Sequence, residues 1–364
     1  MTQSGRHENA DAVRAPVCWT ITDGKPGMES QCLGLAEAVG LPVVVKRIAV
    51  GTPWRWLPPR LWLLPLRAPA PQGDRLEPPW PELVIASGRQ SVAPAAAIRS
   101  ASGGRTICIQ IQTPRIDPRR FDLVVVPQHD RLRGENVVPT QGALHRITPR
   151  RLAEASEQFA PLLAHLPRPL VAVLVGGTNR DYRLDPPVAR RLGEQLAALA
   201  GTFGAGLAVT TSRRTGEANA AALRQGIGET VPLRFWDQLG ENPYFGFLAV
   251  ADAIVVTADS VSMVSEACST GKPVYVVPLP GRSAKLEEFH ERLRAAGITR
   301  PFDGTLDRWR YQPLDDTARV AAIVRELVAK RRAGSLSSLS PAPPRAEAAP
   351  WGLADARRSS RSPD

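Results

Sequence analysis

Four short segments combine glycines, hydroxyl groups and charged side chains, which are the residue types that surround a phosphate or a sugar. They are residues 22–27, 176–180, 210–214 and 258–266. Each segment follows a run of apolar residues that predicts a buried strand. Ligands of open α/β sheets bind beyond the carboxyl ends of the strands. The sequence therefore predicts that these four segments form a ligand-binding edge.

The first of these loops contains Gly24, Lys25 and Gly27. Its glycines permit a tight turn with exposed backbone N–H groups, and the positive end of the helix that follows favours an anion. The spacing is not that of a Walker A loop, because Lys25 precedes Pro26 and no glycine stands five residues before Gly24. Gly24 and Lys25 are candidate ligand contacts, although a plain turn between strand and helix fits the same residues.

Two loops of the second half suit a diphosphate. Gly177, Thr178 and Asn179 offer N–H, hydroxyl and amide groups that can surround phosphate oxygens. The dinucleotide fingerprint G-x-G-x-x-G does not follow a strand here, which argues against a dinucleotide. Arg213 and Arg214 follow the next strand, and a guanidinium pairs with phosphate in a bidentate manner. Contact by one of the two arginines fits better than contact by both, and Arg213 is assigned to the site.

The segment 258–266 carries the strongest signal. Asp259 and Ser260 begin a predicted helix, and small polar residues then recur on one face. These residues are Ser262, Ser265, Glu266 and Ser269. A ligand lying close to the helix suits such a stripe, and the Glu266 carboxylate can accept two hydrogen bonds from a ribose diol. The alternative is a helix packed under a loop, with Glu266 satisfied by backbone N–H groups.

Catalysis requires a base, and two residues at strand ends are candidates. His129 has an ordinary pKa near neutrality, and Asp23 lies in the first loop. His145 is the second choice among the histidines, and a histidine at a strand end is more often structural than catalytic. The five histidines show no metal-ligand spacing, and no carboxylate cluster suggests a metal site. We expect no metal and no cofactor.

The alternation of apolar runs with helical segments predicts two parallel, doubly wound sheets, each covered by helices on both faces. The strands are expected at 17–21, 43–50, 83–86, 106–111 and 123–126, and at 170–175, 207–211, 231–235, 253–257 and 273–277. The helices are expected at 28–39, 149–163, 188–200, 217–224, 243–251, 260–270, 285–296 and 315–332. The predicted division is a disordered N-terminus (1–15), a first domain (16–148), a linker helix (149–168), a second domain (169–333) and a disordered tail (334–364).

Composition limits the partners. The net charge of +11 favours anionic partners, but the arginines are scattered, so nucleic acid is not expected. Four widely spaced cysteines fit a reducing compartment, and the polar N-terminus lacks a secretory core. We expect a cytoplasmic protein. Residues 53–71 combine tryptophans with arginines, which suits a peripheral position on the inner face of a membrane. A proline-rich excursion that packs on its own domain fits this segment equally.

Six motifs in order resemble the mitochondrial fission "elongated mitochondria" family of plants and bacteria. They are DGKPG at 23–27, ASGR at 86–89, PQHD at 127–130, GGTNR at 176–180, TSRR at 211–214 and VTADSVSMVSEA at 256–267. The resemblance spans about residues 17–302 and implies a GT-B-like fold. The last motif also resembles the nucleotide-binding stretch of GT-B glycosyltransferases and of non-hydrolysing UDP-sugar epimerases, in which the matching glutamate holds the ribose.

The sequence and the resemblance together favour a GT-B-like glycosyltransferase that binds a nucleoside-diphosphate-sugar between its domains. Glu266 is expected to hold the ribose, and Gly177, Thr178, Ser260 and Arg213 the diphosphate. Two alternatives stay open. One is a nucleoside-diphosphate-sugar epimerase on the same fold. The other is a non-catalytic adaptor, because plant members of the family that this chain resembles bring a dynamin-like GTPase to the mitochondrial surface.

Overall fold

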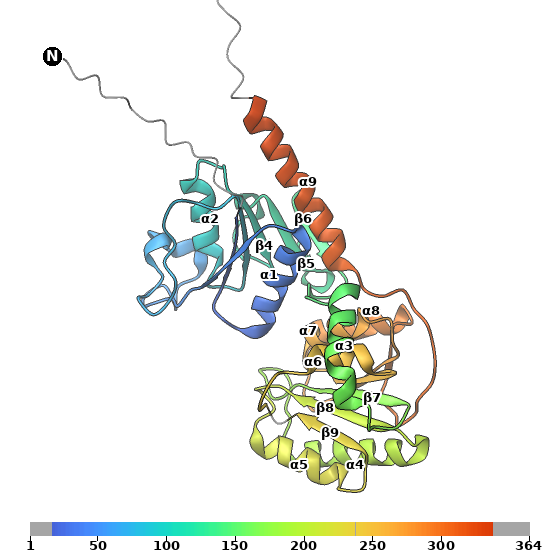
Figure 1. Ribbon diagram of the computed structural model, residues 1–364. Coiled ribbons are helices and arrows are strands. Elements are labelled where there is room, and N and C mark those ends of the chain that lie inside the picture. Colours follow the sequence, from blue (N-terminus) through green and yellow to red (C-terminus); the bar gives the residue numbers. More distant parts are fainter. Residues whose placement is uncertain (1–16, 237, 338–364) are drawn as a thin grey trace, which may run out of the picture.

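The computed structural model describes residues 17–236 and 238–337, which form two halves that each contain one parallel sheet (Figure 1). The segment 1–15 lies outside the described residues, as does the tail from residue 338. Residues 334–337, which the sequence assigned to a disordered tail, continue the last helix instead.

The first sheet has six strands in the order β2-β1-β3-β4-β5-β6, and all neighbours are parallel. Its strands are β1 (Cys18–Thr22), β2 (Val43–Arg47), β3 (Leu83–Ser87), β4 (Ile107–Ile111), β5 (Leu123–Pro127) and β6 (Val137–Thr140). The chain adds β2 on one side of β1 and then β3 on the other side, so the strand order reverses between β1 and β3. Such a switch point opens a crevice at the carboxyl edge.

Both faces of the first sheet are covered. Helix α1 (Pro26–Val39) packs on one face, together with apolar residues from the C-terminal helix. Helix α2 (Val92–Ala101) packs on the other face, beside a long connection that inserts Ile48 and Trp62 into the core. This connection contains the short turns η1 (Pro59–Leu61) and η2 (Pro65–Arg67). Two further turns, η3 (Pro118–Arg120) and η4 (Gln128–Asp130), flank β5.

The second sheet has the order β12-β11-β10-β7-β8-β9 and is also parallel throughout. Its strands are β7 (Leu170–Val175), β8 (Gly206–Thr211), β9 (Leu233–Trp236), β10 (Ala253–Thr257), β11 (Val274–Val277) and β12 (Thr299–Pro301). Counted from β7, this is the strand order of a Rossmann fold, with its switch point between β7 and β10.

The side chains of β7 show how the second half is layered. Val171, Val173 and Val175 face α4 (Pro186–Phe203) and α5 (Glu217–Ile227), which lie on the outer face in Figure 1. Leu170 and Leu174 face the other layer. That layer contains α3 (Pro149–Leu163), α6 (Tyr244–Val250), α7 (Val261–Cys268) and α8 (Ala284–Ala295). Strands buried on both faces explain why the apolar runs do not alternate.

Helix α9 (Asp316–Ser337) returns from the second half and packs on the first (Figure 1). Val320, Ala321, Val324 and Val328 join the core formed by α1 and the first sheet. The prediction that the second domain runs to residue 333 is therefore wrong at this point, because α9 packs with the first half. Its amphipathic pattern identified a helix but carried no information on which sheet would bury the apolar side.

The predicted fold class, two doubly wound parallel sheets, is confirmed. Three elements, α2, β6 and β12, were not predicted from the sequence. Strand β6 contains Pro139 and is partly exposed at a sheet edge, and β12 has only three residues and ends in Pro301. Short edge strands with proline carry little of the apolar pattern by which strands are recognised.

Candidate functional site

A cavity of about 330 Å³ lies between the two halves at the carboxyl edge of the first sheet. The lining residues are Gly24, Pro26, Glu29, Ser30, Leu33, Arg47 and Arg146 from the first half, and Arg213 and Phe245 from the second. Two of the predicted site residues, Gly24 and Arg213, are thereby brought together from different halves. Larger hollows lie at the crossing into α9 and around Asp122, and neither borders the loops that follow β1 and β8.

Arginines dominate the charge of this cavity. Arg47 binds Glu29 through two hydrogen bonds of 2.7 Å, and Arg146 forms an ion pair with Glu37. Arg213 is exposed, and within the described part of the chain it forms no ion pair. A guanidinium without a carboxylate partner can bind a phosphate in a bidentate manner. The cavity is therefore suited to an anion, and Arg213 is the arginine best able to contact it.

The loop after β1 forms the rim of the cavity. Gly24 has a φ of 77°, a left-handed conformation that side chains disfavour, and α1 begins two residues later at Pro26. The positive end of α1 thus borders the cavity. Lys25 Nζ lies 2.5 Å from Asp23 Oδ2, and the Lys25 side chain is exposed. Neither Asp23 nor Lys25 lines the cavity, but both adjoin it through Gly24.

Glu266 lies one layer behind the cavity. Its side chain is buried, Tyr244 donates to Oε2 at 2.6 Å, and Ser30, which lines the cavity, donates to Oε1 at 3.3 Å. Burial raises the pKa of Glu266 to about 7, against the opposing effect of these two hydrogen bonds. In this structure α7 is packed inside the protein, as in the alternative stated above. The Glu266 carboxylate is satisfied by two hydroxyls, however, and not by backbone N–H groups.

The loops at the switch point of the second sheet are joined by hydrogen bonds and an ion pair. The carboxylate of Asp259 is fully buried and accepts from Gly177 N at 3.0 Å, from the Thr257 hydroxyl at 2.7 Å and from Arg214 at 2.8 Å. Asn179 accepts from two backbone N–H groups of its own loop. These polar groups are consumed in building the loop, and they are not free for a phosphate.

Thr178 and Ser260 also have partners in the protein. The Thr178 hydroxyl donates to Leu184 O and accepts from Leu184 N. Ser260 caps α7 by accepting from Met263 N at 3.4 Å. Arg214 is held by Asp259, which leaves Arg213 as the arginine at the cavity. The prediction that one of the two arginines contacts the ligand stays a prediction.

The small polar stripe of α7 faces the first half. The Ser265 hydroxyl accepts from Ala143 N at 2.9 Å, and the Ser269 hydroxyl lies 2.5 Å from His145 Nε2. Ser262 approaches Gly27 at the start of α1, where an added Cβ would lie 3.4 Å from its hydroxyl. The stripe that suggested a ligand is therefore largely an interface between the two halves.

The two candidate bases are not brought together. Asp23 follows β1 and His129 follows β5, and β3 and β4 lie between these strands, a separation of roughly 14 Å. His129 packs edge-on against Phe289 of α8, and burial lowers its pKa. His145 is buried against α7, and burial lowers its pKa to about 4. Neither histidine lines the cavity.

Sequence reasoning missed Arg47, Arg146 and Ser30 as cavity residues. Arg47 ends β2 in the structure, but the predicted strand continues to residue 50, so the strand-end rule does not select it. Arg146 and Ser30 lie in a connection and on a helix face, where the sequence carries no comparable signal.

Across residues 17–236 and 238–337, no three His, Cys, Asp or Glu side chains are grouped in a way that could hold a metal ion. None of the helices in these ranges has the length and apolar character needed to cross a membrane. All four cysteines are free and buried.

Comparisons with known proteins match most of the chain. Residues 26–328 match the model of the family described as Mitochondrial fission ELM1. The Mitochondrial fission protein ELM1 of Arabidopsis thaliana is 32% identical in a match that covers 90% of this chain and 94% of that protein. An uncharacterized protein of Rickettsia prowazekii (strain Madrid E), RP120, is 26% identical in a match that covers 67% of this chain and 79% of that protein.

Among solved structures, the UDP-GlcNAc 2-epimerase of Methanocaldococcus jannaschii superposes with a TM-score of 0.53 at 12% identity, covering 87% of this chain and all of that one. At this identity the similarity establishes the fold, which is that of two Rossmann-like domains arranged as in GT-B proteins, with a cleft between them.

Proposed function

This chain belongs to the mitochondrial fission ELM1 family, and we propose that it binds a nucleoside-diphosphate-sugar between its halves and transfers the sugar to an acceptor. The observation that supports this most strongly is the arginine-lined cavity at the carboxyl edge of a doubly wound sheet. The fold supports it further, because the similar epimerase is named for a UDP-sugar substrate.

The diphosphate is placed against Arg213, with Arg146 and the start of α1 as further positive groups. Gly177, Thr178, Asn179 and Asp259 then act as a scaffold, because their bonds fix the loops on either side of the switch point. In this arrangement they position Ser260 and the side of the cavity that the second half of the chain forms. This revises their predicted role from direct contact to support.

Glu266 is proposed to hold the ribose. Ser30 and Tyr244 present two hydroxyls to it, one on each carboxylate oxygen. A ribose diol offers the same two donors, so the ligand can take their place once these side chains turn aside. Phe245, beside Tyr244, lines the cavity and offers an aromatic face to the base.

In the transfer, an acceptor oxygen attacks the anomeric carbon while the bond from that carbon to the diphosphate breaks. The acceptor loses its proton to a base, and Asp23 is the candidate that adjoins the cavity. The leaving diphosphate gains negative charge, which fixed guanidinium groups stabilise. The reaction therefore draws on the arginines of the cavity more than on any single base.

An epimerase is the second candidate, since the similar solved structure is a UDP-GlcNAc 2-epimerase. It shares the donor site but needs no acceptor. Chromatography of the sugar products distinguishes the two reactions. A non-catalytic adaptor, the alternative left open by the resemblance to plant members of the family, would yield no product from any donor.

The test is calorimetric titration with UDP, ADP, GDP and CDP. Arg213→Ala is expected to weaken the best-bound nucleotide about tenfold or more, because a charge-assisted hydrogen bond to phosphate is lost. Arg191→Ala is the matched control, since Arg191 is an exposed arginine on α4, on the outer face of the same half. Circular dichroism checks that both variants are folded.

The proposal fails if none of the four nucleotides binds, or if Arg213→Ala and Arg191→Ala weaken binding equally.

A further inference from the structure

The connection between β2 and β3 exposes a group of large apolar side chains. Trp56, Leu61, Leu63 and Leu64 are 76%, 54%, 81% and 64% exposed. They are four of the seven exposed large apolar residues in the described part of the chain, and they fall within nine positions. Exposed apolar groups gathered in this way mark an interaction surface.

The group is held in place by the rest of its connection. Trp62 is buried in the core, and its Nε1 donates to Leu57 O at 3.0 Å. Trp54 Nε1 donates to Leu63 O at 2.8 Å. Arg89, from the loop after β3, donates to Trp56 O and Leu57 O. The apolar side chains are therefore presented outward by an anchored segment.

The charged residues of this segment are all basic. Arg55, Arg60 and Arg67 are exposed, and the sequence from residue 51 to residue 73 contains no aspartate or glutamate. None of the three forms an ion pair within the described residues. Apolar side chains that can enter the lipid, flanked by free arginines, match a bilayer with anionic headgroups.

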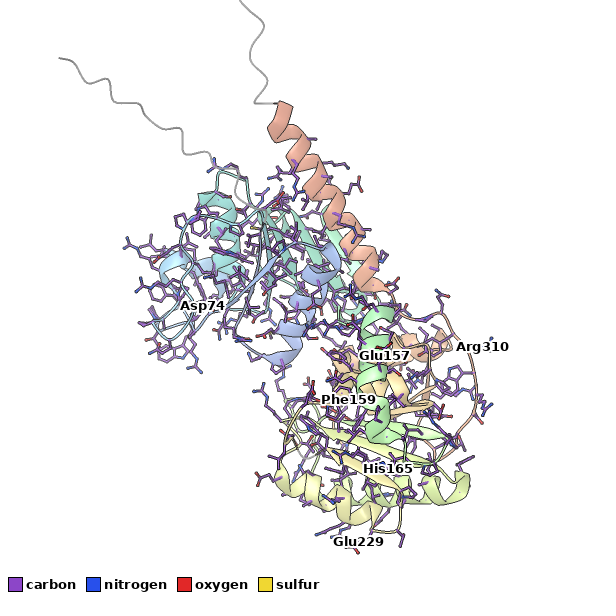
Figure 2. All side chains as sticks on the ribbon, viewed as in Figure 1. Asp74, Glu157, Phe159, His165, Glu229 and Arg310 are labelled. Atoms are coloured by element: carbon purple, nitrogen blue, oxygen red, sulfur yellow. The ribbon has the colours of Figure 1, made fainter. Side chains whose placement is uncertain are left out.

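The segment lies at the same edge of the first sheet as the cavity. Arg47, which lines the cavity, ends β2 just before this connection, and Arg89 follows β3. The connection leads on to Asp74, which accepts from Arg47 N at 2.6 Å and which Figure 2 shows on the side of the first half away from α9. A surface bound by this segment would lie beside the opening of the cavity.

We propose that residues 53–67 form a docking surface for an anionic lipid bilayer. Trp56, Leu61, Leu63 and Leu64 enter the boundary between headgroups and acyl chains, and Arg55, Arg60 and Arg67 contact headgroup phosphates. This inference is independent of the proposed function, because neither the apolar group nor its arginines line the cavity.

The test is sedimentation of the full chain with vesicles of phosphatidylcholine alone, and with vesicles that also contain phosphatidylglycerol. The chain is expected to sediment with the anionic vesicles and to be released from them by salt. The double variant Trp56→Ser/Leu63→Ser is expected to bind at least tenfold more weakly, since each buried apolar side chain contributes substantially to insertion. Its control is Phe203→Ser/Leu239→Ser, which changes two exposed apolar residues outside the segment.

The charge contribution is tested separately. Arg60→Ala/Arg67→Ala is expected to weaken binding to anionic vesicles several-fold. Arg191→Ala/Arg234→Ala removes the same charge from exposed positions of the second half and is expected to leave binding unchanged. Failure to bind either kind of vesicle overturns the proposal and points to a protein partner for this surface. Equal binding by Trp56→Ser/Leu63→Ser and its control also overturns it.

Discussion

The loops at the carboxyl edges of the two sheets use the same residue types in different ways. At the second sheet, Gly177, Asn179 and Asp259 hydrogen-bond to one another and to neighbouring backbone. At the first sheet, Gly24 of the loop after β1 borders an open cavity, together with Ser30 of α1 and Arg47 at the end of β2. Motif composition made the second set the stronger candidate, whereas geometry favours the first. A polar side chain at a strand end is therefore available to a ligand only where the protein does not already use its hydrogen bonds, as for Arg213, which lines the cavity and forms no ion pair among the described residues.

The largest expected effect tests the scaffold role of Asp259. Asp259→Ala leaves Gly177 N, Thr257 and Arg214 without their shared acceptor. We expect a loss of about 3 kcal/mol or more in the free energy of unfolding, measured with urea. The exposed ion pair of Asp307 with Arg300 is the control, and Asp307→Ala is expected to cost less than about 1 kcal/mol. If Asp259→Ala loses nucleotide binding at unchanged stability, Asp259 is a ligand contact and the comparison is wrong.

The next effect concerns Glu266, which belongs to the second half but bonds to Ser30 of the first. Its pKa of about 7 exceeds the ordinary value of 4.5, so the folded state binds the proton more tightly than the unfolded chain. Stability should therefore fall as pH rises from about 4.5 to about 7, by a total on the order of 3 kcal/mol.

Glu266→Gln removes this titration. Unfolding measured at about pH 5 and about pH 8 should show a stability gain for the variant only at the higher pH. Glu291→Gln, at an exposed position of α8, is the control and should show the same difference from the wild type at both values. A Glu266→Gln profile parallel to that of the wild type would mean that the carboxylate is hydrated.

A smaller effect is expected at Gly177. A Cβ at this position would lie 2.1 Å from Arg214 O and 2.5 Å from Thr215 N, both of which are backbone atoms. Gly177→Ala is expected to lower the free energy of unfolding by about 1–3 kcal/mol, because two loops must move apart. Gly201 in α4 has no atom within 4 Å of an added Cβ, and Gly201→Ala should stabilise by about 0.5–1 kcal/mol. Equal stability of both variants would show that the loop packing is loose.

Much of the fold was predictable, because strands buried on both faces leave long apolar runs. The bounds of β7 and β10 match the predicted ranges, and α3 matches as well. The position of α9 was not predictable, since an amphipathic helix fits either sheet. Local pattern identifies an element, whereas its partner depends on the path of the chain through space.

The site was predictable only in part. The rule that ligands lie beyond strand ends selected Gly24 and Arg213, and both line the cavity. It also selected Thr178 and Asn179, whose hydrogen bonds are used within their own loop. Saturation of a polar group depends on contacts between residues far apart in sequence, such as Asn179 with Asp259. Spacing along the chain does not reveal it.

The position of the nucleotide is measured most directly by a crystal structure with the nucleoside diphosphate that binds best. We expect the diphosphate between Arg146 and Arg213, with a ribose hydroxyl on Glu266 in place of Ser30 or Tyr244. A diphosphate seated on the loop of Gly177 and Thr178, away from Arg213, would contradict this expectation.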